Sequence, residues 1–167
     1  DTPVIMLPAR LTRWKGHEIL IEALSLIKDI RFFCVLVGDH DTKRNYKSEL
    51  ENRIKFQGLT NRVKITGHCK DMVSAYKVSD IVISASLDPE PFGRITVEAQ
   101  AMGCVVVAAD HGGAQETIQH NRTGILVEPR NSEALADGIK KALEMKTEDR
   151  TSMGIAAREF VSVSYTH

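Results

Sequence analysis

Six short runs of apolar and β-branched residues recur along the chain, and segments with helical periodicity separate them. The runs cover residues 4–7, 32–37, 63–66, 81–84, 104–109 and 124–127. They are continuously apolar, which is typical of strands that helices cover on both faces. Because strands that alternate with helices are joined by right-handed crossovers, the pattern predicts an α/β protein with a doubly wound parallel six-stranded sheet.

The chain predicts a single domain. Its 167 residues, 43% of them hydrophobic, suffice to bury a core without a disulfide or metal. No linker, repeat or shift in composition marks a boundary. We therefore expect one domain over residues 1–161, with a last helix that ends near Val161 and a frayed tail at 162–167.

Charge and cysteine content limit the function classes. Lys and Arg total 22 against 22 Asp and Glu, so no overall field attracts nucleic acid, and any anion site must be local. The three cysteines, Cys34, Cys69 and Cys104, lack metal-ligand spacing, and their odd number favours a reducing cytoplasm. We expect neither a signal peptide nor a transmembrane segment, because no apolar run approaches about 18 residues.

The stretch at residues 88–110 joins a loop, a helix and a strand without spare residues. Two prolines keep the backbone around Glu90 extended, and Gly93 allows a ligand or a turn to approach the main chain closely. The helix that follows carries Glu98 in its first turns, and its N-terminal backbone N–H groups are suited to an anion. Both carboxylates can therefore face a ligand placed at this helix N-terminus.

The two glutamates and their neighbours resemble a known family. Glu90 is followed by Pro-Phe-Gly, Glu98 by Ala, and Gly103 by x-Val-Val, a combination that resembles the group 1 family of retaining nucleotide-sugar glycosyltransferases. The resemblance runs from Arg10 to about Val127. It implies the C-terminal donor-binding domain, a Rossmann-like half of a GT-B fold, without the N-terminal acceptor domain. We expect this fragment alone to be inactive.

The resemblance also implies roles for individual residues. Arg10 and Lys15 follow the first strand in the family's Arg, gap, Lys-Gly pattern and would grip the donor diphosphate. Glu90 would bind the donor sugar and, with these two cations, make up the catalytic residues. Glu98 would bind the ribose. The rest of the predicted nucleotide-sugar site comprises His68 and Cys69, whose backbone would meet the base, and Phe92, Gly93, Arg94, Ile95 and Thr96.

Three features leave alternatives open. Asp39 and Asp41, two apart, could hold a metal, but the position matches a turn after a strand, which we favour. No metal and no cofactor is therefore predicted, since the nucleoside-diphosphate sugar is a substrate. His111 could donate to a phosphate or be a solvated loop residue. Arg94 stands where the family commonly has an aliphatic residue, so its backbone N–H is the expected phosphate contact.

The predicted function is binding of a nucleoside-diphosphate sugar for retaining transfer of a hexose to an acceptor glycan or lipid. The acceptor would bind through the missing N-terminal domain, in bacterial envelope synthesis by resemblance, and the full-length protein could be peripheral to the inner membrane. A nucleotide-sugar epimerase of the same fold and a non-catalytic nucleotide-sugar-binding module are the alternatives. An NAD-dependent oxidoreductase is disfavoured because no Gly-x-Gly-x-x-Gly follows the first strand.

Overall fold

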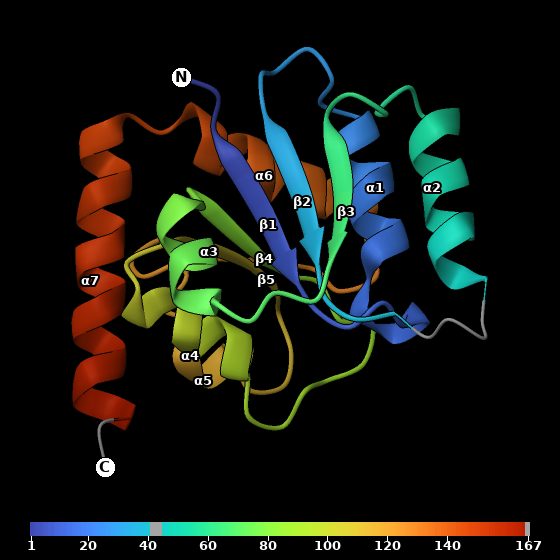
Figure 1. The fold of residues 1–167 in the computed structure, drawn as a ribbon. Helices are drawn as coiled ribbons and strands as arrows, with labels where there is room; N and C mark the ends of the chain where they lie inside the picture. Colours follow the sequence, from blue (N-terminus) through green and yellow to red (C-terminus); the bar gives the residue numbers. More distant parts are fainter. Residues whose placement is uncertain (41–44, 166–167) are drawn as a thin grey trace.

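The computed structural model describes residues 1–40 and 45–165 and contains a six-stranded parallel sheet (Figure 1). The strands lie in the order β3-β2-β1-β4-β5-β6, and every adjacent pair is parallel. The predicted α/β, doubly wound fold class is confirmed, and each strand end falls within one residue of its predicted position. The strands are Val4–Pro8 (β1), Phe33–Val37 (β2), Val63–Gly67 (β3), Ile81–Ser84 (β4), Val105–Ala109 (β5) and Ile125–Val127 (β6).

Helices connect the strands, as the alternation of apolar runs with helical segments predicts. After the 3-10 turn η1 (Arg13–Lys15), the helices are α1 (His17–Ser25), α2 (Tyr46–Phe56), α3 (Met72–Val78), α4 (Arg94–Ala101), α5 (Ala114–Thr117), α6 (Ser132–Glu144) and α7 (Thr147–Tyr165).

The expected end of the last helix was wrong. Helix α7 continues to Tyr165, so residues 162–165 are helical where we expected a frayed tail. Its buried side chains, Met153, Ala157 and Val161, recur every four residues and anchor one face of the helix. Once a helix is anchored in this way, each further residue adds a backbone hydrogen bond at little cost.

Alternate residues of the central strands point into two separate hydrophobic clusters. In β4, Ile81 and Ile83 belong to the first cluster, and Val82 belongs to the second. β5 repeats the pattern with Val105 and Val107 against Val106. This explains why the strand sequences are continuously apolar, since both faces of the sheet are covered.

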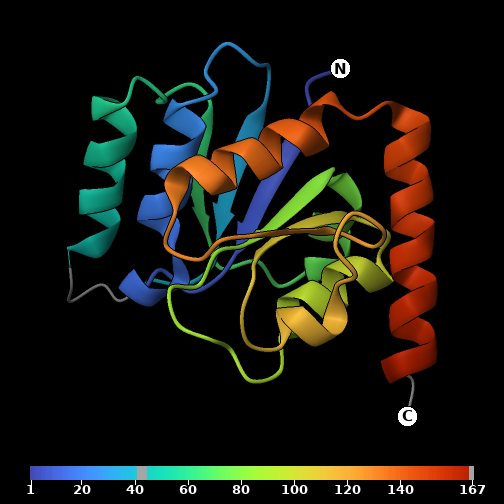
Figure 2. The same ribbon diagram turned by 180° about the vertical axis from the view of Figure 1, so that it is seen from behind.

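The helices form a layer on each face of the sheet. Figure 2 shows α1 and α6 side by side on one face, and the two helices contact each other there. Helices α3, α4 and α5 lie on the opposite face, and α7 packs against α4 (Figure 1). Among the described residues, no helix has the length and apolar character needed to cross a bilayer.

Candidate functional site

The candidate site lies between β1 and β4, where the order in which successive strands are added to the sheet changes direction. Strand β1 pairs with β2 on one side and with β4 on the other. The chain leaves β1 toward α1 on one face and leaves β4 toward α4 on the other face. Open α/β sheets bind ligands in such a crevice, at the carboxyl ends of the strands. The two segments that border it, residues 9–15 and 85–93, carry Arg10, Lys15 and Glu90.

Backbone contacts hold these two segments together. Gly16 has a φ of 84°, and a Cβ atom there would lie 2.0 Å from the carbonyl oxygen of Ala85. The N–H of Leu87 donates to the carbonyl oxygen of Trp14 over 2.7 Å. Since a side chain at position 16 would collide with main chain, the Lys15-Gly16 turn can meet the β4 segment only as a glycine turn.

Lys15 and Glu90 form a partly buried ion pair across the crevice. The Lys15 Nζ atom donates to Glu90 Oε1 over 2.6 Å, and the two side chains are 16% and 26% exposed. The other carboxylate oxygen, Oε2, accepts a hydrogen bond from Ser86 Oγ over 2.5 Å. Glu90 is therefore held at both oxygens, one of them by Lys15.

Helix α4 presents a free N-terminus to the crevice. Gly93 is its N-cap, has a φ of 53° and supplies no side-chain hydrogen bond to the first turn. The first N–H groups of a helix have no partner within the helix, so they are suited to an anion. The Thr96 hydroxyl is buried, donates to the Gly93 carbonyl oxygen over 2.6 Å and lies 2.8 Å from Thr117 Oγ1. Thr96 can therefore meet a ligand only through its backbone.

The segment after β5, residues 111–113, contacts the backbone of the loop that carries Glu90. The N–H of Gly113 donates to the Glu90 carbonyl oxygen over 2.7 Å. A Cβ atom at Gly112, whose φ is 61°, would lie 2.6 Å from the same oxygen. His111 Nε2 is 2.9 Å from the carbonyl oxygen of Ser86. His111 therefore contacts the backbone of this loop, a role that the sequence did not suggest.

A groove of about 380 Å³ runs from the end of β1 to α4. It brings together five of the predicted site residues from three separate segments of the chain. These are Arg10, His68, Cys69, Ile95 and Glu98. A smaller adjoining hollow is lined by three more of them, Glu90, Gly93 and Thr96.

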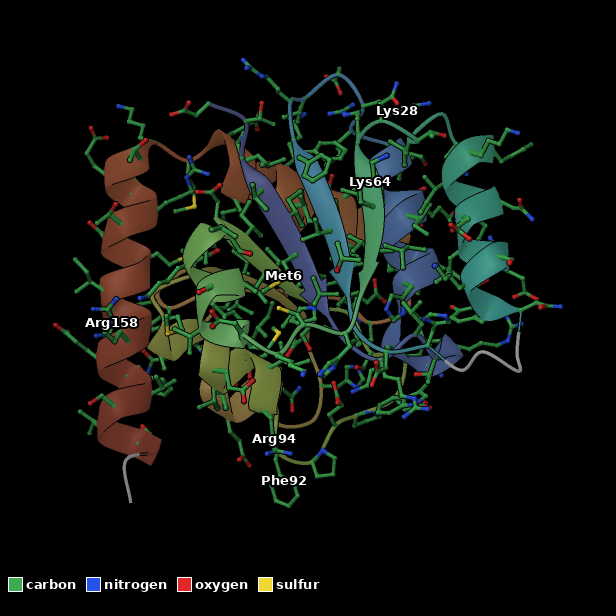
Figure 3. The ribbon with its side chains drawn as sticks, viewed as in Figure 1. Met6, Lys28, Lys64, Phe92, Arg94 and Arg158 are labelled. Carbon is green, nitrogen blue, oxygen red and sulfur yellow. The ribbon has the colours of Figure 1, made fainter. Side chains whose placement is uncertain are left out.

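Three predicted site residues, Lys15, Phe92 and Arg94, line neither the groove nor the smaller hollow. Phe92 is 79% exposed, and Figure 3 shows it together with Arg94 at the outer tip of the β4–α4 connection. Arg94 is the first residue of α4, so its backbone forms the start of that helix.

The structure adds to the groove Tyr76, which the sequence pattern did not identify, and Asp39, which it assigned to a turn. Tyr76 lines the groove, and its hydroxyl donates to Glu98 Oε1 over 3.1 Å. In the sequence Tyr76 fits the apolar face of a short helix, so nothing marks its hydroxyl as a site group. Asp39 also lines the groove, and its carboxylate lies 3.8 Å from His68 Nδ1.

The Asp39 turn is described only in part. The second aspartate of that pattern, Asp41, lies outside the described residues. Within residues 1–40 and 45–165, no three His, Cys, Asp or Glu side chains are grouped so that they could hold a metal ion. A larger cavity of about 570 Å³ lies between residues 10–14 and the start of α2, but neither Glu90 nor Glu98 lines it.

The chain is similar in sequence to a family of known proteins over nearly its whole length. The sequence model of the family described as "Glycosyl transferases group 1" matches residues 1–160. The chain belongs to the group 1 glycosyltransferases.

Solved structures and curated relatives agree with this family assignment. A glycosyltransferase from Rickettsia africae is 41% identical, with a TM-score of 0.94 over 99% of this chain and 44% of that one. Anabaena HepE in complex with UDP is 36% identical, with a TM-score of 0.91 over 98% of this chain and 44% of that one. The GDP-mannose-dependent alpha-(1-6)-phosphatidylinositol monomannoside mannosyltransferase of Mycobacterium tuberculosis is 29% identical over 99% of this chain. This chain spans 44% of that relative's length.

One prediction concerns His17, which follows the Lys15-Gly16 turn and is fully buried. Burial lowers the pKa of His17 from 6.5 to about 4. The His17 side chain binds a proton more tightly in the unfolded chain than in the folded chain. The free energy of unfolding is therefore at its full value above about pH 6.5 and decreases as the pH falls toward about 4. Urea unfolding at about pH 7.5 and about pH 5 should show a loss of roughly 2 kcal/mol from this group.

The variant His17→Gln isolates this contribution from that of the carboxylates. It lacks the titrating group, so its free energy of unfolding should differ less between the two pH values than that of the parent chain. An equal pH dependence of the two proteins would contradict the assignment.

Proposed function

We propose that this chain is the donor-binding half of a retaining glycosyltransferase and binds a nucleoside-diphosphate sugar in the groove beside α4. The observation that carries the proposal is the arrangement at the crevice. A helix N-terminus without a side-chain cap lies beside two cations and two carboxylates that come from different segments. The relative HepE has been crystallised with UDP and with UDP-glucose, which supports a ligand of this class.

The diphosphate is assigned to Arg10, Lys15 and the first turn of α4. The bond between the anomeric carbon and the diphosphate breaks during transfer, and negative charge grows on the leaving phosphate oxygens. Positive groups and N–H dipoles held in place before the reaction stabilise such charge most effectively. The proposal gives this work to the three protein groups, with no requirement for a bound metal ion.

The two carboxylates are assigned to different parts of the donor. Glu98 lies in the groove of about 380 Å³ and is assigned to the ribose, while the backbone at His68 and Cys69 borders the place of the base. Glu90 lines the adjoining hollow and is assigned to the hexose. Donor binding must then exchange the Lys15–Glu90 ion pair for contacts of Lys15 with phosphate and of Glu90 with sugar hydroxyls.

The acceptor belongs to the part of the relatives that this chain does not span. We propose that an N-terminal domain supplies the acceptor site and that the acceptor is a glycan or lipid of the bacterial envelope. The mycobacterial relative, named for transfer to a phosphatidylinositol mannoside, supports a lipid-linked acceptor. We place the protein in the cytoplasm because Cys34, Cys69 and Cys104 are all free thiols. We also propose that the full-length protein associates peripherally with the inner membrane.

The first test is whether the chain binds nucleoside diphosphates at all. We expect one of UDP, GDP and ADP to raise the melting temperature, by mass action on the folded state. The shift should persist in EDTA. No sugar should be transferred, because the acceptor site is absent. The absence of any shift with all three nucleotides, or sugar transfer by the chain alone, would contradict the proposal.

The role of Arg10 can be tested against a neighbouring arginine. Arg10→Ala should weaken diphosphate binding by about 1.5–3 kcal/mol, the range for hydrogen bonds to charged groups. Arg13→Ala is the matched control, because Arg13 is exposed and pairs with Glu49 over 2.6 Å instead of facing the groove. Titration calorimetry at low and high salt should show the Arg10 contribution shrinking with salt. Equal losses for the two variants would refute the assignment of Arg10.

The two glutamates should respond differently to the sugar of the ligand. Glu98→Gln should weaken the free nucleotide and the nucleotide-sugar alike, since both contain the ribose. Glu90→Gln should weaken only the nucleotide-sugar, and it should not weaken the free nucleotide because the substitution releases Lys15 for the phosphates. Glu51→Gln, an exposed change on α2, is the control. A Glu90→Gln protein that loses both ligands equally would exclude the hexose assignment.

A further inference from the structure

The ribose-facing carboxylate of Glu98 is held by a residue from another helix. Tyr76 lies in α3 and Glu98 in the second turn of α4, and the Tyr76 hydroxyl donates to Glu98 Oε1 over 3.1 Å. Both residues line the groove of about 380 Å³. Glu98 is exposed, whereas Tyr76 is only 4% exposed, so the tyrosine is the fixed member of this pair.

The position of Tyr76 is set by the core. Its ring belongs to the hydrophobic cluster that contains Val82, Ala99 and Val106. The thiol of Cys104 lies 3.3 Å from the Tyr76 carbonyl oxygen and donates to it. Since protein interiors are close-packed, the ring has one position, and its hydroxyl is fixed where Tyr76 lines the groove.

The Tyr76 hydroxyl keeps its proton and remains a donor in neutral solution. Burial, and to a smaller extent the neighbouring charge of Glu98, raise the pKa of Tyr76 well above its ordinary value. Glu98 accepts this bond with one oxygen, and a carboxylate has about four acceptor positions. The remaining positions are available to the groove.

We propose that Tyr76 is a positioning residue that orients the Glu98 carboxylate toward the ribose 2′- and 3′-hydroxyls of the donor and thereby gives the site its preference for ribonucleotides. The inference rests on the proposed function of the groove. An unrestrained glutamate loses rotamer freedom when it binds, and this loss weakens affinity. The bond from Tyr76 removes part of that loss before the ligand arrives.

The test compares ligands that differ only at the ribose. Isothermal titration measures the Kd of UDP, GDP and ADP and of their 2′,3′-dideoxy forms, and the pair that binds the parent chain is used for the variants. Tyr76→Phe keeps the ring and removes the hydroxyl. It should weaken the ribonucleotide by about 3- to 10-fold, the cost of ordering one long side chain on binding, and leave the dideoxy form within about twofold.

Two further variants separate positioning from packing. Tyr46→Phe removes a buried hydroxyl from the opposite layer of the protein and should change neither Kd. In a Glu98→Gln background, Tyr76→Phe should have no further effect on the ribonucleotide, because it acts through Glu98.

Each contrary result has a separate meaning. If Tyr76→Phe weakens the ribonucleotide and its dideoxy form equally, Tyr76 only supports packing and the inference fails while the proposed function stands. If Glu98→Gln does not discriminate between the two forms, the ribose assignment fails and takes the inference with it. If no nucleoside diphosphate binds the parent chain, the proposed function itself is overturned.

Discussion

The candidate site depends on main-chain segments that approach each other more closely than any side chain would allow. Gly16 lies against the carbonyl of Ala85, and Gly112 and Gly113 lie against the backbone of the Glu90 loop. A Cβ atom at any of the three glycines would lie 2.0–2.7 Å from main-chain atoms. These contacts bring the segments after β1, β4 and β5 into one rigid crevice. The positions of Lys15, Glu90 and the α4 N-terminus follow from this backbone arrangement.

Within that crevice, one cation and one carboxylate form an ion pair. Lys15 is neutralised by Glu90, and Glu90 also receives a hydrogen bond from Ser86. A partly buried charge without a partner would be costly, so the pairing stabilises both groups before a ligand is present. On donor binding, a phosphate would take the place of Glu90 beside Lys15, and sugar hydroxyls would take the place of Lys15 beside Glu90. Under the proposed function, the groove therefore binds an anion joined to a polyol more readily than a simple anion.

The sequence predicted the fold and the segments that form the candidate crevice because both depend on backbone properties. The apolar runs placed each strand to within one residue, and the glycine before Arg94 located the start of α4. The pairings of side chains were beyond such reasoning. Tyr76 and Glu98 are 22 residues apart in the sequence, and Lys15 and Glu90 are 75 residues apart. The outward direction of Phe92 and the extension of α7 to Tyr165 are likewise set by tertiary packing.

The most direct measurement is a crystal structure of the chain with a bound nucleoside diphosphate. The account predicts phosphate oxygens within about 2.7–3.2 Å of the first N–H groups of α4 and of the Arg10 guanidinium. The ribose should contact Glu98, and Lys15 should have moved from Glu90 to the phosphates. A nucleotide bound instead in the cavity between residues 10–14 and α2, with the start of α4 empty, would contradict the account.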